Sequence, residues 1–158
     1  MQTIVPPINP LADPRDAGHL QPEATALTEV FDRTVDSVKG YAKMVEKAEP
    51  SFRDTAERFR ALHARHADEL ARILADLGID ADRDGSIMGT VNQAVVTFRA
   101  FFDDIDEDVM DQVRSGEDWV LKAFEEAIVE QAGAVPTAKL REMQTELTEL
   151  LADTQHLG

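Results

Sequence analysis

The chain has 158 residues, a formal net charge of −15 and no cysteine. This length suits one domain, and the lack of cysteine excludes disulfides, thiolate metal sites and cysteine nucleophiles. The negative charge disfavours nucleic acid, because such binding depends on Lys and Arg that neutralise phosphates. It disfavours anionic membrane surfaces for the same reason. We therefore expect a soluble protein that binds neither nucleic acid nor membranes.

The first residues show no targeting pattern. They lack a basic region followed by an apolar run, so we predict no secretory signal. No stretch approaches the roughly 20 apolar residues of a membrane span, and we expect a cytoplasmic protein. Residues 1–21 are rich in proline, which removes backbone donors and fixes φ, and Pro22 closes them. We predict an extended or disordered tail over residues 1–21 and one helical domain over residues 22–158.

Two long helices should follow the tail, over residues 23–48 and 51–77, because apolar residues recur there at spacings of three and four. Pro50 separates them and suits the first turn of the second helix, so the connection is short and the helices should be antiparallel. Gly78 suits a C-terminal cap. The inner stripe of the second helix comprises Phe52, Ala56, Phe59, His63, His66, Leu70, Ile73 and Leu77.

A polar connection over residues 79–85 precedes a third predicted helix over residues 86–102, with Ser86 as its N-cap. A fourth helix is predicted over residues 107–131. Gly116 lies inside it, and Ser115 with Asp118 resembles a capping box, so the helix either breaks there or continues with an irregularity. We favour one continuous helix.

A fifth helix is predicted over residues 136–155, after a turn marked by Gly133 and Pro136. No useful length of the sequence shows the alternation typical of strands. The fold class is therefore all-α: an antiparallel bundle of about five helices, four of them long, with an extended N-terminal tail.

Three inner positions are polar where a core should be apolar: His63, His66 and Glu117. His63 and His66 are three residues apart and share a helix face, and Glu69 follows three residues later. Imidazole and carboxylate suit zinc and iron(II), and metal-binding bundles direct such side chains inward from facing helices. The sequence thus offers a candidate iron or zinc site made of His63, His66, Glu69, Glu117 and Asp36.

Helix register suggests which acids face these positions. Counted from the turn near residue 49, the two histidines should lie opposite Asp32 and Asp36. Counted back from the turn near residue 134, Glu117 should face residues near 150, where Glu149 and Asp153 are available. The polar core residues are therefore expected to share a layer.

Each polar position also has a structural interpretation. A histidine near a core is often a hydrogen-bonded structural residue and not a ligand. Glu117 suits the first turn of a helix that begins after Ser115, where the helix dipole favours a carboxylate. Three glutamates of the fifth helix are expected to be solvated: Glu142, Glu146 and Glu149.

Four short motifs occur in a fixed order between residues 25 and 155. They are Asp36-Ser-Val-Lys-Gly-Tyr41 followed by Glu46, Ala67-Asp-Glu-Leu70, Gly85-Ser-Ile-Met-Gly89, and Gly116-Glu-Asp118 with Phe124 six residues later. In their order and spacing the chain resembles a bacterial ferritin-like four-helix-bundle family of unknown function. The resemblance implies a ferritin-like fold and leaves the biochemical role open.

The ligand pattern of ferritin-like di-metal sites is largely absent. Such sites take one Glu from each of two helices and a Glu-x-x-His from each of the others. Arg60 stands three residues before His63, and His63 stands three before His66, so the second helix has no Glu-x-x-His. The fifth helix offers only Asp153-x-x-His156, at its end. We therefore expect a degenerate di-metal site.

Three functions stay open. We favour a non-enzymatic structural, interaction or stress-associated bundle. The second is a metal store, sensor or redox site that uses the histidines and acids above. The third is an adaptor that docks a protein partner through residues 1–21. An apolar helix shoulder at Trp119 also predicts a homodimer.

Overall fold

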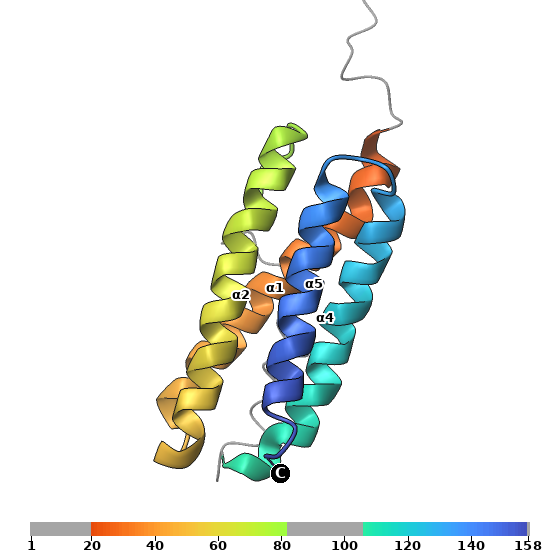
Figure 1. The fold of residues 1–158 in the computed structure, drawn as a ribbon. Coiled ribbons are helices and arrows are strands. Elements are labelled where there is room, and N and C mark those ends of the chain that lie inside the picture. Colours follow the sequence, from red (N-terminus) through yellow and green to blue (C-terminus); the bar gives the residue numbers. More distant parts are fainter. Residues whose placement is uncertain (1–19, 82–105, 158) are drawn as a thin grey trace, which may run out of the picture.

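The computed structural model describes residues 20–81 and 106–157. In these two ranges the regular elements are helices: α1 (Leu20–Lys47), α2 (Pro50–Asp76), the short 3-10 helix η2 (Glu107–Val109), α4 (Met110–Glu130) and α5 (Pro136–Asp153). Figure 1 shows the long helices side by side in a bundle. The predicted all-α bundle is confirmed, whereas the third predicted helix, residues 86–102 with Ser86 at its start, lies outside the described residues.

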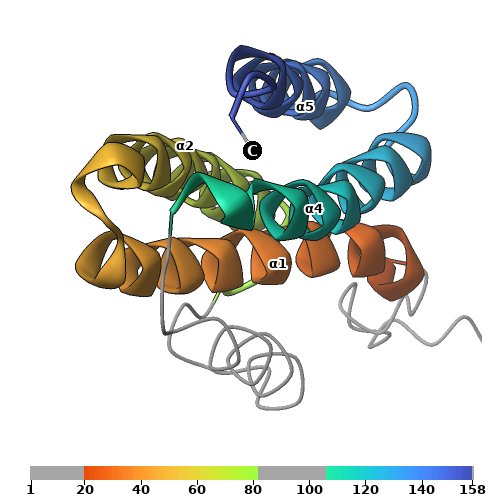
Figure 2. The same ribbon diagram turned by 90° about the horizontal axis from the view of Figure 1, so that it is seen from below.

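The four long helices are arranged so that each contacts two others. Within the described part of the chain, α1 packs against α2 and α4, and α5 packs against the same two helices. Figure 2 shows α1 and α5 on opposite sides of α2 and α4. In the described ranges, α5 therefore occupies the corner of the bundle that lies opposite α1.

Most helix boundaries match the predictions to within a few residues. α1 begins at Leu20, inside the predicted tail, because Pro22 falls in the first turn, where the missing N–H has no intrahelical role. Gly78 follows α2 with a φ of 76°, as expected of a C-terminal cap. None of the helices in the described ranges is long and apolar enough to cross a membrane.

α4 runs through Gly116 without a break. The Ser115 hydroxyl donates a 2.9 Å hydrogen bond to the Asp111 carbonyl of the same helix, so it does not cap a new helix start. The interpretation of Glu117 as a first-turn carboxylate is therefore wrong. Glu117 stands seven residues after Met110, the first residue of α4, which is about two turns into the helix, and it is 2% exposed.

The inner stripes meet in one apolar core. Its largest fully buried members come from all four long helices: Leu27, Phe31, Phe52, Phe59, Leu70, Phe124, Leu140 and Leu147. Burying a large apolar side chain contributes roughly 1.5–3 kcal/mol to the stability of the fold. Burial of these apolar stripes is therefore the main interaction that holds the four helices together. The polar inner positions must be accommodated inside it.

Two polar contacts join helix ends that are far apart in sequence. The Glu130 carboxylate, at the end of α4, accepts hydrogen bonds from the backbone N–H groups of Ala26 and Leu27 at 3.1 and 3.2 Å. Ala26 and Leu27 stand six and seven positions after Leu20, the first residue of α1, so Glu130 is tied to α1 about two turns inside its start.

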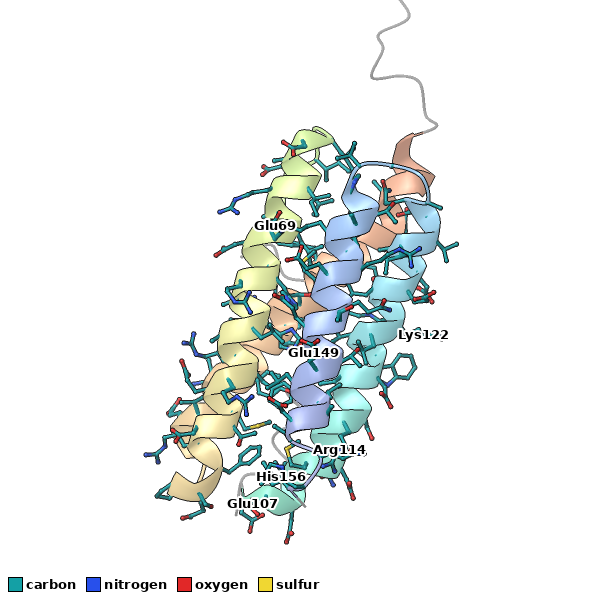
Figure 3. All side chains as sticks on the ribbon, viewed as in Figure 1. Glu69, Glu107, Arg114, Lys122, Glu149 and His156 are labelled. Carbon is teal, nitrogen blue, oxygen red and sulfur yellow. The ribbon has the colours of Figure 1, made fainter. Side chains whose placement is uncertain are left out.

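The second contact lies at the other end of the bundle, where Arg114 and the end of α5 meet (Figure 3). The Arg114 guanidinium donates to the carbonyls of Thr154, Gln155 and Leu157, the last at 2.7 Å. These carbonyls follow the last residue of α5, where a helix leaves carbonyls without intrahelical partners, and the Thr154 carbonyl also accepts from the Leu157 N–H at 3.1 Å. Arg114 therefore satisfies the C-terminus of α5.

Candidate functional site

A hydrogen-bonded cluster of three polar side chains crosses the bundle interior. The Tyr41 hydroxyl on α1 donates to Glu117 Oε1 on α4 at 2.5 Å. His63 Nε2 on α2 lies 2.9 Å from Glu117 Oε1 and 3.1 Å from Oε2. All three side chains are buried. One carboxylate thus links the three helices α1, α2 and α4.

The hydrogen bonds of the cluster point toward Glu117. A carboxylate only accepts hydrogen bonds, so the Tyr41 hydroxyl and His63 Nε2 are the donors. Burial and the neighbouring Glu117 raise the pKa of Tyr41 well above its ordinary value, which keeps the hydroxyl protonated.

His66 forms a second polar pair, one turn further along α2. Its Nε2 lies 2.7 Å from Glu146 Oε2 on α5, and Arg65 Nη1 lies 3.4 Å from the other oxygen. Burial lowers the pKa of His66, although Glu146 acts against that shift. Contacts with His66 and Arg65 lower the pKa of Glu146 despite its partial burial. The fold therefore favours a neutral imidazole beside a charged carboxylate.

Aromatic rings connect the two pairs. Tyr41 stacks on Phe59 and on His63, with centroids 5.2 and 5.7 Å apart. His63 meets His66 edge to face at 6.3 Å, and His66 meets Phe124 in the same way at 5.9 Å. Such pairs restrict ring rotation and add to burial. Both imidazoles are therefore held in fixed orientations.

Three buried polar atoms lack a hydrogen-bond partner within the described ranges: Asp36 Oδ2, His63 Nδ1 and His66 Nδ1. A buried unpartnered polar atom costs roughly 1–3 kcal/mol, and each such atom in a native fold calls for an explanation. An imidazole nitrogen with a free lone pair is also a metal donor. These atoms are the part of the interior that hydrogen bonding leaves unexplained.

A pocket opens between α2 and α5 beside the second pair. Its lining includes His66 and Glu69 from α2 and Met143 and Glu146 from α5, with charged side chains around them. Figure 3 marks Glu69 on α2, close to the edge that adjoins α5. The side chain of His66 is 2% exposed, so it reaches the pocket from the core.

The structure does not bring the five residues of the predicted metal site into one cluster. His63 is paired with Glu117, His66 lines the α2–α5 pocket, and Glu69 pairs with Arg72 at 3.1 Å. Within residues 20–81 and 106–157, no group of three or more His, Cys, Asp or Glu side chains is arranged to hold a metal ion. Metal binding by these residues stays a prediction.

Two register predictions require correction. On α1, Tyr41 stacks on His63, at a position where Asp32 and Asp36 were expected. Asp153, expected near Glu117, pairs instead with Arg58 on α2 at 2.9 Å.

Two further residues of the fifth helix differ from their predictions in opposite ways. Glu149, also expected to face Glu117, is exposed. Glu146 was expected to be solvated, but it is partly buried and bonded to His66. Its position three residues after the inward Met143 is the sequence signal that identifies it as a neighbour of the core.

Asp32 and Asp36 form an acidic strip on α1 together with Glu29. Burial, Glu29 and Asp36 raise the pKa of Asp32 to about 6. Burial also raises the pKa of Asp36, against the opposing effect of Lys39. Like charges that are partly removed from water disfavour ionisation, so this strip destabilises the fold at neutral pH.

Comparison with known proteins identifies one family. A family model described as a domain of unknown function, DUF2383, matches residues 23–130. This segment begins in α1 and ends at the last residue of α4, so α5 lies outside it. No curated protein and no solved structure gave a significant match.

Proposed function

Because the chain belongs to the DUF2383 family of unknown function, we propose that it is a non-enzymatic, ferritin-like bundle with a structural, interaction or stress-associated role. Its polar interior then aligns the helices and is the remnant of a di-metal site. The observation that carries this proposal is the environment of Glu117, whose oxygens face protein donors.

The argument concerns what surrounds a buried carboxylate. A working metal centre needs lone pairs directed at the ion, whereas Tyr41 and His63 both approach Oε1 of Glu117 and His63 also approaches Oε2. A buried carboxylate paired with donors from two other helices favours one arrangement of those helices, because any other leaves the carboxylate or the donors unpaired. The cluster therefore suits a device that sets the register of α1, α2 and α4.

The test replaces the cluster as a unit. We expect Tyr41→Phe, His63→Leu and Glu117→Met together to give a folded bundle with the same oligomeric state, because exchanging all partners for apolar groups of similar size is often neutral. Metal analysis of untagged protein should show far less than one ion per chain before and after the exchange. A folded triple variant that loses bound metal or a binding partner would contradict the proposal.

The proposal includes a homodimer through the surface around Trp119. This side chain is 60% exposed, and Arg33 and Lys122 lie 5.6 and 5.7 Å from its ring. Exposed aromatics with adjacent cations are typical of interface anchors. Light scattering should give twice the monomer mass, and Trp119→Ala should halve it, while Val129→Ala on the same helix should not. A monomer at all concentrations contradicts this part.

Metal binding is a second candidate function, as an iron or zinc store, sensor or redox site. The unpartnered Nδ1 atoms of His63 and His66 favour it. Addition of iron(II) or zinc to the untagged protein should then give about one ion per chain, and His66→Ala should remove it. Stoichiometry far below one refutes this candidate. The adaptor hypothesis stays a prediction, because residues 1–19 of its tail lie outside the described residues.

A further inference from the structure

Two ion pairs join α2 to α5 at a regular spacing. Arg58 on α2 lies 2.9 Å from Asp153 on α5, and Arg65 lies 3.4 Å from Glu146. The two arginines are seven residues apart, and so are the two acids, which is about two helical turns on each helix. These two pairs, the seam pairs, therefore connect the facing sides of the two helices by opposite charges at two levels.

One further step of seven residues brings two cations to the same seam, Arg72 on α2 and Lys139 on α5. Each forms an ion pair inside its own helix, Arg72 with Glu69 at 3.1 Å and Lys139 with Glu142 at 3.2 Å. Both cations line the α2–α5 pocket, a cavity of about 230 Å³. These intrahelical pairs do not connect the two helices, and the seam is open at their level.

The side of α5 that faces α4 is held differently. α5 packs more extensively against α4 than against α2, and the short turn over residues 131–135 joins the two helices at one end. At the other end, Arg114 of α4 binds the carbonyls that follow α5. Exposed ion pairs are weak and are screened by salt, so α5 separates from α2 more readily than from α4.

The seam covers His66. The side chain of His66 is 2% exposed and lines the pocket, and its Nε2 lies 2.7 Å from Glu146, the carboxylate that Arg65 also contacts. Movement of α5 away from α2 takes Glu146 with it and leaves this nitrogen facing the pocket. His63 is 0% exposed and is bonded to Glu117 on α4, so it stays covered when only this seam opens.

We propose that α5 is a gate over His66, held closed by the seam pairs and opened when salt screens them. The inference goes beyond the proposed function and requires no bound ion. An open seam admits water and small polar solutes to His66, while α1, α2 and α4 stay packed. The accessibility of one buried histidine then depends on ionic strength.

The experiment treats the full chain with diethyl pyrocarbonate, which modifies accessible neutral imidazoles, and measures the rate at each histidine by peptide mass spectrometry at a fixed neutral pH. Raising sodium chloride from about 0.01 M to about 1 M shortens the Debye length from about 30 Å to about 3 Å. We expect the rate at His66 to rise at least about 3-fold, a change within reach of two exposed ion pairs. His156, at an exposed position, is the internal reference, and His63 should stay slow.

Substitutions assign the effect to the seam pairs. Arg58→Gln with Arg65→Gln should raise the low-salt rate at His66 to its high-salt value. The matched control, Lys43→Gln with Lys47→Gln, removes two cations from exposed ion pairs on α1 and should leave that rate unchanged. Arg58→Asp should also open the seam, and adding Asp153→Arg should close it again, because the exchange restores the pair.

Three results would overturn the gate. The first is a rate at His66 that salt leaves unchanged, and the second is an equal rise at His63, which indicates opening of the whole bundle. The third is an equal effect of the lysine and arginine variants, which indicates a response to net charge alone. The salt series uses the parent chain, so it decides the question even if a variant does not fold. Loss of the gate would leave the proposed function standing.

Discussion

Replacing Glu117 by alanine removes the acceptor that α1 and α2 share. Tyr41 Oη and His63 Nε2 then become buried donors without a partner, and a cavity replaces the carboxylate. Each unpaired donor costs roughly 1–3 kcal/mol, and the cavity left by the deleted side chain adds to that cost. We expect a loss of about 3–5 kcal/mol, a large part of the 5–15 kcal/mol that ordinarily stabilises a domain.

Glu117→Gln should be milder and diagnostic. At the place of Oε1 the amide oxygen can still accept from both Tyr41 and His63 Nε2. The amide nitrogen then takes the place of Oε2, 3.1 Å from the same ring nitrogen, and replaces an accepted hydrogen bond by a contact between two donors. We expect a loss of about 1–3 kcal/mol. Glu126→Ala, at an exposed position of α4, should stay within about 0.5 kcal/mol of the parent.

Urea unfolding followed by far-UV circular dichroism measures these differences, with the slope m unchanged between variants. A loss of 3–5 kcal/mol should also lower the melting temperature by about 6–20 °C for a chain of this size. If Glu117→Ala is no more destabilising than Glu126→Ala, Glu117 is not the buried acceptor described above, and the account of the interior fails.

Four further outcomes follow from other contacts. Burial lowers the pKa of His66, so the unfolded chain binds its proton first and stability should fall below about pH 6.5; His66→Gln should flatten this slope in pH-dependent urea titrations. The raised pKa of Asp32 means that its charged form destabilises the fold, and this penalty decreases as the pH falls below about 6. Asp32→Asn should raise the free energy of unfolding by up to about 1 kcal/mol at pH 7.5, since solvent screens the half-exposed group. No gain in stability at that pH contradicts the raised pKa of Asp32. Glu130→Ala should cost about 0.5–1.5 kcal/mol through the lost hydrogen bonds to α1, and Glu130→Gln less, both by thermal melting. Arg114→Ala should speed hydrogen exchange at the end of α5 and cost about 1–3 kcal/mol, whereas equal exchange in both proteins would mean that the cap is unimportant.

Periodicity predicted the helices because apolar residues at spacings of three and four lie on one face only when the segment is helical, and that face is then buried. The same pattern did not predict the role of Tyr41, because a three-and-four spacing counts tyrosine as an apolar residue and does not indicate a hydrogen bond from its hydroxyl. Glu146 was hidden for the converse reason: it lies beside the stripe of α5 and has the composition of a solvated position. Side-chain class alone therefore missed Tyr41, whose ring stacks on His63, and Glu146, which is hydrogen-bonded to His66.

Which residues face each other across neighbouring helices is harder to predict than the helices themselves. Counting residues from a turn assumes straight, parallel axes, yet one helical turn is 5.4 Å long, and a long side chain reaches across most of that length. This is why Asp36 was expected at the level where Tyr41 meets His63. The polarity of His63, His66 and Glu117 was visible in the sequence, but the partner of each depended on packing.

The contact between Glu130 and the first turns of α1 has a consequence for how this protein is assembled from parts. It brings together the two ends of the segment that the family model covers, residues 23 and 130. Segments whose ends meet are readily inserted into other chains, permuted or extended, because the entry and exit of the chain need little space. The start and the end of the DUF2383 segment therefore lie near each other in the bundle, and the chain continues into α5 from that place.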